Sequence, residues 1–203
     1  MKQKILFLTV LVCLTLTVNA QNAEQARKIL DKTASLLNRK GGASANFIFN
    51  NGTKESFHGT IAIKGKKFYA KTQQASTWFN GKTQWTYMVK SEEVNVSNPN
   101  EAQQAQMNPY KFITLYKKGY TLGMTDTTND YKIHLIAQSK QSSIPEMYIT
   151  INKKTNLPTQ VKMLQKEKWS TITISNFKAK NLSDSMFSFN LKDFPNAEII
   201  DLR

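Results

Sequence analysis

Residues 77–89 read TWFNGKTQWTYMV and place two apolar runs on either side of an Asn80-Gly81 pair. Asn-Gly between alternating apolar residues is a strong hairpin signal, because both residues tolerate the positive φ that a tight turn needs. On the second arm, Trp85, Tyr87 and Val89 recur at every second residue and therefore share one face of a strand. The stretch predicts a β-hairpin with an aromatic face.

Strand patterns extend from this hairpin in both directions. Upstream, Phe47 and Phe49 lead to a second hairpin signal at Asn51-Gly52, and a further pair of strands meets at Gly65. The other strands that we expect cover residues 57–63, 68–72, 94–96, 131–137, 147–151, 159–164 and 169–177, with a polar turn at 152–156 and final strand pieces at Phe189 and Ile199-Ile200.

Two segments follow helical spacing instead. Asn22 and Gln25 resemble a capping box, and apolar residues then recur at intervals of three and four up to Gly41-Gly42. Asn108-Pro109 resembles an N-cap followed by proline at the first helical position, which predicts a short second helix through Lys117. Residues 183–187 add one helical turn. Together these patterns predict a mostly β protein with helices (α+β). We expect a curved antiparallel sheet whose concave side is filled by helices or by a ligand.

The first twenty residues predict export. Lys2 and Lys4 precede an uncharged apolar run over residues 5–18, and Val18-Asn19-Ala20 has the small-residue pattern of a signal-peptidase site. A run of fourteen residues is shorter than the ~20 that a membrane-spanning helix needs. We therefore expect residues 1–20 to be a cleaved signal peptide and residues 21–203 to form a single domain.

Composition limits the classes of partner. Cys13, the one cysteine, lies in the expected signal, so the mature chain has no disulfide and no thiol nucleophile. Loss of Lys2 and Lys4 lowers the net charge from +14 to +12. An exported protein rarely meets nucleic acid, so anionic lipid surfaces, lipopolysaccharide or acidic proteins are the counterparts to expect, unless the basic surface is simply solvated.

Catalytic patterns are not found in the sequence. His58 and His134 are the two histidines; they lie on separate expected strands and belong to no metal-binding motif. The sequence has no G-x-S-x-G elbow and no glycine-rich phosphate loop, and its one adjacent acidic pair, Glu92-Glu93, would point to opposite faces of a strand. We expect no enzyme activity, no metal and no cofactor. The many aromatic residues are either packed core or the lining of an apolar cavity, and composition leaves both open.

Several short motifs resemble LolA, the periplasmic lipoprotein carrier. Residues 79–87, FNGKTQWTY, match a D-G-K-T-x-W-x-Y-like turn and strand of that family, with Asn80 in place of the acid. The remaining matching segments follow in the same order, and they are residues 58–64 (HGTIAIK), 67–69 (KFY), 108–113 (NPYKFI) and the D-x-x-F-x-F-like residues Asp184, Phe187 and Phe189.

The resemblance implies an unclosed antiparallel β half-barrel capped by short helices, of the LolA/LolB type, whose cavity holds acyl chains. It implies a monomer in the periplasm of a Gram-negative bacterium. Cargo would be acylated lipoproteins, received from an inner-membrane lipoprotein-releasing ABC transporter and passed to an acceptor at the outer membrane where one exists. The residues that we expect to line the cavity or lid are Phe49, Ile61, Phe68, Trp78, Trp85, Tyr87, Phe112, Ile113, Tyr116 and Trp169.

One departure from the family concerns its lid. The family holds the lid partly through an arginine after the second long strand, and residues 63–67 here read IKGKK. Lys64 is a weak stand-in, because an ammonium lacks the forked donors of guanidinium. Alternatives to the carrier are a glycolipid-binding or envelope-stress-sensing module of the same fold, and a secreted hydrolase that uses His58 or His134.

Overall fold

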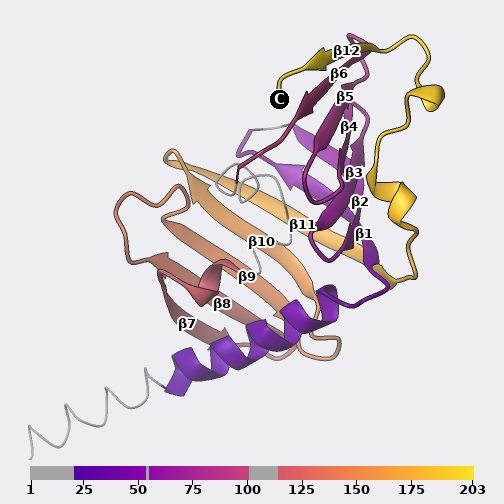
Figure 1. Cartoon of the computed structure of the whole chain (residues 1–203). Helices are drawn as coiled ribbons and strands as arrows, with labels where there is room; N and C mark the ends of the chain where they lie inside the picture. The colour runs from indigo at the N-terminus through magenta and orange to yellow at the C-terminus, as the bar shows by residue number, and fades with distance from the viewer. Residues whose placement is uncertain (1–20, 54, 101–113) are drawn as a thin grey trace, which may run out of the picture.

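The protein is described by a computed structural model that covers residues 21–53, 55–100 and 114–203. A helix covers residues 21–37, and the remainder is built around a 12-stranded sheet (Figure 1). The strands are β1 (Ala43–Asn50), β2 (Ser56–Lys64), β3 (Lys67–Thr72), β4 (Ala75–Phe79), β5 (Gln84–Met88), β6 (Glu93–Ser97), β7 (Tyr120–Asp126), β8 (Asp130–Ala137), β9 (Glu146–Asn152), β10 (Pro158–Gln165), β11 (Lys168–Ala179) and β12 (Glu198–Asp201). Single 3-10 turns are η1 (Leu115–Lys117), η2 (Asp184–Phe187) and η3 (Leu191–Asp193).

The sheet is open. Its order is β12-β6-β5-β4-β3-β2-β1-β11-β10-β9-β8-β7, and the edge strands β12 and β7 do not pair with each other. Neighbouring strands are antiparallel except for β12, which runs parallel to β6. The predicted fold class, an unclosed β half-barrel with a helix, is confirmed.

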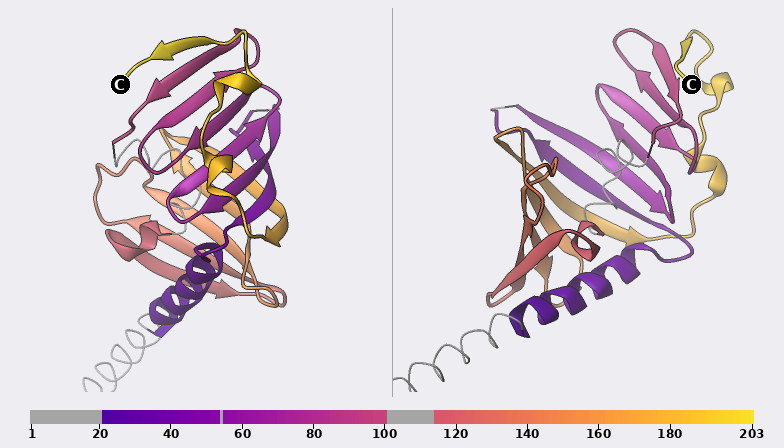
Figure 2. Two further views of the ribbon diagram at one scale, coloured as in Figure 1. Left: turned by 45° about the vertical axis from the view of Figure 1, so that its right-hand side comes forward. Right: turned by 60° about the vertical axis from the view of Figure 1, so that its left-hand side comes forward.

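The sheet bends into two wings that meet where β1 pairs with β11. Figure 2 shows β1–β6 and β12 as one wing and β7–β11 as the other, with the helix across one end. The register of β1 against β11 shifts between Ser44 and Asn46, and Asn176 on the opposite strand has φ +51°. Such a bulge bends a strand and increases its twist, which contributes to the curvature at this junction.

The helix covers one face of the sheet, which we call the helix-side face. Ala26 and Leu30 are fully buried against apolar residues of the β7–β10 wing. Further along the helix, Ala34 and Leu37 pack with Ile63 and Phe177. The helical spacing in the sequence therefore marks the buried side of the helix, because Ala26, Leu30, Ala34 and Leu37 lie along one stripe that packs on the sheet.

The other face, which we call the outer face, is partly covered by the C-terminal segment, residues 183–203. Figure 2 shows this segment along the β1–β6 wing, on the side away from β7–β11. Phe187 is fully buried, and the rings of Phe189 and Phe194 meet Trp78 edge-on, with centroids 5.5 and 5.6 Å away. Both faces of this wing thus bury apolar side chains.

Some expectations from the sequence need correction, and others fall outside the described residues. Residue 21 is already helical and Asn22 donates to the Met124 carbonyl across 2.9 Å, so Asn22 is not the helix cap. Phe189 is not in a strand, and strand β7 was not predicted. The signal peptide and most of the second helix, residues 108–113, lie outside the described residues; within 114–117 only η1 forms. In the described ranges, no helix has both the length and the apolar character to span a membrane.

Candidate functional site

The helix-side face of β1, β2 and β11 carries apolar side chains that are only half buried. Phe49 pairs across the strands with Phe57, their ring centroids 6.3 Å apart, and its partner on β11 is Ile172. Ile61 lies on the same face of β2, opposite Ala45. Phe49, Phe57, Ile61 and Ile172 each keep part of their surface exposed. Because exposed apolar surface is costly in water, this half-buried strip is a candidate contact surface for an apolar ligand.

Over strands β8 to β10, by contrast, the protein fills the same face with its own atoms. Ile133, Leu135 and Ile149 are fully buried beneath the helix. Tyr116 of η1 joins this core at 1% exposure, and its hydroxyl donates to Asp31 of the helix. Tyr116 was expected to contact lipid, but in this structure it packs η1 onto the helix. On this face the half-buried strip is therefore the candidate contact surface, and the buried core of β8 and β9 is not.

A pocket of about 900 Å³ opens where the strip ends, between the β1–β2, β8–β9 and β10–β11 connections. Phe49 and Pro145 contribute its apolar lining. The β10–β11 turn contributes Lys166 and Glu167, which have φ of +47° and +63°, a region that side-chain-bearing residues avoid. Its volume is in the range of ligand pockets.

The two tryptophans of the hairpin lie on the outer face. Phe68 pairs with Phe79 and Tyr69 with Trp78, so Trp78 and Phe79 point to opposite faces. Trp78 pairs in turn with Trp85, so both indoles share the outer face rather than the face of Phe49, and Trp78 contacts the C-terminal segment. The aromatic hairpin face predicted from the sequence exists, and it is the outer one.

Tyr87 shares this outer surface. Its ring lies 4.6 Å from that of Phe194 in the C-terminal segment. Phe68, on the helix-side face, is 3% exposed and contacts Phe79 at 5.5 Å between centroids. Phe68 is thus buried here, whereas Tyr87 is half buried.

Trp169 also lies on the outer face, in a separate cluster. Its strand partner is Leu164, while the next pair, Ser170 and Met163, points to the helix side. Trp169 contacts the ring of Tyr148, and the ammonium of Lys162 lies 4.7 Å from the Trp169 ring centroid. The ten predicted residues are therefore divided: Phe49, Ile61 and Phe68 share the helix-side face, Tyr116 is in the core, and Trp78, Trp85, Tyr87 and Trp169 face outward. Phe112 and Ile113 lie outside the described residues.

His134 belongs to the Trp169 cluster. Its ring stacks on Tyr148 at 4.2 Å and 5°, and its Nε2 lies 2.8 Å from Glu146 Oε1. The Tyr148 hydroxyl donates to the same oxygen across 2.8 Å. The hydrogen bond from Tyr148, and then His134, lower the pKa of Glu146, and the same hydrogen bond raises the pKa of Tyr148. In the described part of the chain, no three histidine, cysteine or acidic side chains group together in a way that could hold a metal ion.

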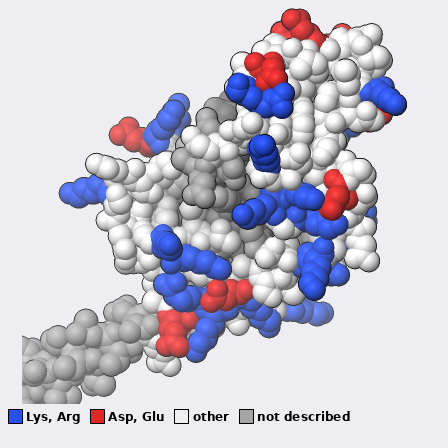
Figure 3. Space-filling view, in the orientation of Figure 1, with Lys and Arg blue, Asp and Glu red and all other residues white. Residues whose placement is uncertain are grey.

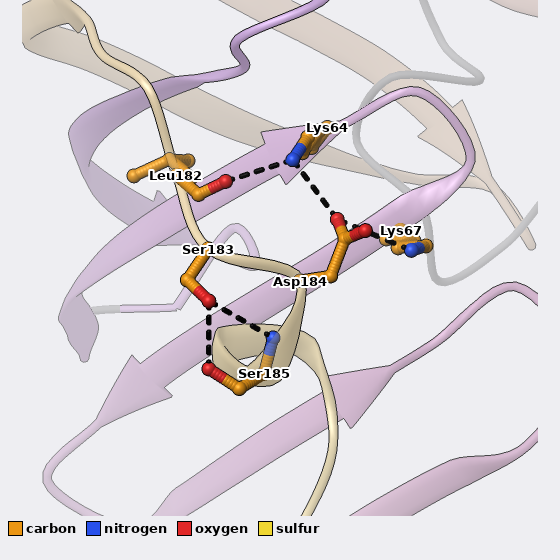
Figure 4. A network of polar contacts seen from close by, with 6 residues as sticks. All are labelled: Lys64, Lys67, Leu182, Ser183, Asp184 and Ser185. Atoms are coloured by element: carbon orange, nitrogen blue, oxygen red, sulfur yellow. Dashed lines mark hydrogen bonds and ion pairs between the residues drawn. The ribbon is translucent and has the colours of Figure 1, made fainter.

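Lys64 has a different role from that of the family arginine for which it was considered a stand-in. Its ammonium donates to the Leu182 carbonyl across 2.8 Å and pairs with Asp184 at 2.9 Å, and Lys67 pairs with the same carboxylate at 3.2 Å (Figure 4). These two lysines lower the pKa of Asp184. The ion pairs attach η2 to the β2–β3 hairpin, so Lys64 holds the C-terminal segment on the outer face.

Phe57 and Ile172 are part of the candidate strip but were not singled out from the sequence. The alternation of β1 contains the needed signal, since Phe47 and Phe49 share a face and their partners across the ladder are fixed by the register. Gly59 lies directly beneath the Phe47 ring, where an added Cβ would approach Phe47 Cζ to 2.5 Å. Glycine at position 59 therefore lets the Phe47 ring lie across β2.

An open, bent sheet with a helix on one face and a half-buried apolar strip beside it defines an open β half-barrel. Sequence comparison then identifies the family: residues 16–167 match the outer membrane lipoprotein carrier protein LolA family, and the chain belongs to it. Among curated proteins, the comparison finds no match.

Comparison with solved structures finds similar chains at low identity. An uncharacterized conserved protein from Thermus thermophilus superposes with a TM-score of 0.60 at 15% identity, covering 87% of this chain and 99% of that one. A LolA superfamily protein from Nitrosomonas europaea has a TM-score of 0.45 at 10% identity, with 81% and 97% covered. LprF from Mycobacterium bovis also has a TM-score of 0.45 at 10% identity, with 80% and 98% covered.

Proposed function

We propose that the protein is a non-catalytic carrier that binds lipoprotein acyl chains along the strip of Phe49, Phe57, Ile61 and Ile172 and moves them across the periplasm. The half burial of these side chains, on the face that also holds the helix, is the observation that carries the proposal. Family membership supports it. Every methylene removed from water is worth about 0.8 kcal/mol, so acyl chains need such a surface to cross an aqueous compartment.

The open sheet and the pocket beside the strip fit a carrier that must both bind its cargo and release it. The sheet is not closed: its edge strands β12 and β7 do not pair, so the two wings on either side of the strip are not joined at their far edges. The pocket of about 900 Å³ at the end of the strip provides a place where the polar part of the cargo leaves the apolar surface. In this proposal, the inner-membrane lipoprotein-releasing ABC transporter loads the carrier, and an outer-membrane acceptor unloads it.

The test compares two neighbouring residues on β1 that point to opposite faces. Phe49→Glu places a carboxylate on the strip, whereas Ile48→Glu places one on the outer face, where Ile48 is already 39% exposed. Protein purified from the periplasm is analysed by native mass spectrometry. We expect bound lipid in the wild type and in Ile48→Glu, and about a tenfold lower bound fraction in Phe49→Glu, because an unpaired carboxylate opposes an apolar ligand.

Lipoprotein sorting is the second readout. Depletion of the protein should leave lipoproteins in the inner membrane, and Phe49→Glu should fail to restore their sorting while Ile48→Glu restores it. Absence of lipid from the wild-type protein together with unchanged sorting would refute the carrier role. A binding module with a different lipid would instead show bound lipid with normal sorting.

The secreted-hydrolase alternative uses the histidines as bases. His134 is already bonded to Glu146 and stacked on Tyr148, and His58 lies on the outer face of β2, away from the strip. Ester turnover that disappears in His58→Ala or His134→Ala would favour that alternative over the carrier.

A further inference from the structure

The outer face has a groove of its own, on the opposite side of the sheet from Phe49. Two pockets of about 790 and 430 Å³ adjoin there and share Asn46, Thr60 and Tyr69 in their lining. Phe194 lines one end and Met186 the other, so the C-terminal segment forms one side of the groove and β1–β3 its floor. We call this depression the outer groove. Its larger part has the volume of a small-molecule site.

The charges around the outer groove have one sign. Lys71, Lys178 and Lys180 line it, with His58, and among the described residues that line it none is acidic. No ion pair within the described ranges engages any of these three lysines. Lys64 and Lys67 nearby are different, since both pair with Asp184. Unpaired ammonium groups around a concave surface attract an anion.

Lysine and arginine are the main charged groups on the face seen in Figure 3, in keeping with a net charge of +14 for the whole chain. A basic surface by itself indicates no ligand. The outer groove differs from an ordinary basic surface because its lysines surround a pocket with an aromatic wall.

Aromatic rings and free hydrogen-bonding groups complete the lining. Tyr69, Tyr87 and Phe194 supply rings, with Tyr87 and Phe194 in contact at 4.6 Å. Asn46 and Ser175 supply an amide and a hydroxyl that make no side-chain hydrogen bond within the described part of the chain. Rings that contact C–H faces, beside polar groups that bond hydroxyls, suit a sugar better than an acyl chain.

We propose that the outer groove binds a phosphorylated saccharide, either free or as the head group of a glycolipid. Lys71 and Lys178 contact the phosphate, since lysine binds phosphate as a point charge. Tyr69 and Tyr87 pack against the sugar ring, and Asn46 bonds its hydroxyls. This site is independent of the acyl-chain strip, because the two lie on opposite faces of the same strands.

The test uses the mature protein labelled with ¹⁵N and titrated with glucosamine 1-phosphate, with glucosamine as the control sugar that carries the same amine but lacks the phosphate. We expect saturable amide shifts confined to the outer groove, and a Kd about tenfold higher for glucosamine. The double variant Lys71→Gln with Lys178→Gln should weaken phosphosugar binding by at least about tenfold. Lys162→Gln should not, because Lys162 lies over Trp169, outside the groove.

Flotation with vesicles distinguishes the source of the head group. Binding both to the free phosphosugar and to vesicles that carry a phosphorylated diglucosamine lipid supports a site for the head group itself. Binding to those vesicles alone supports recognition at a membrane. Equal binding to phosphatidylglycerol vesicles, equal affinity for glucosamine, or the same shifts with a polyglutamate peptide would overturn the saccharide assignment. Phe49→Glu should leave this binding intact, so failure of the carrier proposal would not be confused with failure of this one.

Discussion

Replacing Phe187 by alanine tests whether the C-terminal segment is part of the folded core. Phe187 is 0% exposed and belongs to η2, which packs on β3 and β4. Phe→Ala at a fully buried site costs about 3–5 kcal/mol, a large share of the ~5–15 kcal/mol that stabilises a typical domain. With a urea m-value of about 2 kcal/mol/M, the unfolding midpoint should fall by roughly 2 M.

The adjacent Met186 is the matched control for this prediction. It lies on the same 3-10 turn but is 38% exposed, so Met186→Ala should change the unfolding free energy by less than about 0.5 kcal/mol. Both variants are unfolded in urea and followed by tryptophan fluorescence, which reports directly on Trp78 beneath the segment. If Phe187→Ala unfolds at the same urea concentration as Met186→Ala, the C-terminal segment does not dock as described, and the outer face of the wing is not core.

Three further predictions follow from the faces, the ion pairs and the turns. Phe49→Trp should make tryptophan emission sensitive to quenching by brominated fatty acid. Ile48→Trp should not, because position 48 and the three native indoles lie on the outer face. Equal quenching in the two variants would contradict the assignment of faces. Asp184 has a pKa below its ordinary 3.8, so its ion pairs stabilise the fold at pH values above 3.8, and this stabilisation is lost as the pH falls through and below that value. The difference in urea midpoint between wild type and Asp184→Asn should therefore shrink between about pH 6 and pH 3. A difference that stays constant over this range would exclude the linkage. The double variant Lys166→Asn with Glu167→Gly should raise the unfolding free energy by about 1 kcal/mol, because the native Lys166 and Glu167 both have a positive φ that Asn and Gly adopt at lower cost. A lower thermal midpoint in the variant would show that the native side chains make contacts worth more than this strain.

Most of the elements, and the class of fold, can be predicted from the sequence. The hairpin at Asn80-Gly81 forms between β4 and β5: the Asn80 Oδ1 accepts from the amides of Lys82 and Thr83, and Gly81 has φ +102°. The turn at residues 152–156 and the 3-10 turn at Asp184–Phe187 also form where the sequence predicts them. These features depend on neighbours along the chain, so local patterns are sufficient to reveal them. Strand β7 was missed although Tyr120, Leu122 and Met124 alternate, since Gly123 weakens the pattern.

Only the tertiary structure decided which face each side chain occupies. Alternation places Trp78 and Phe79 on opposite faces, but it does not say which face the helix covers, and a displacement by one residue exchanges the two. In most antiparallel sheets one face is polar and resolves the ambiguity. Here the helix buries one face and the C-terminal segment buries part of the other, so both carry large apolar residues. The contact of Lys64 with Leu182 and the parallel pairing of β12 with β6 join residues about 100 apart along the chain, and no local pattern contains such contacts.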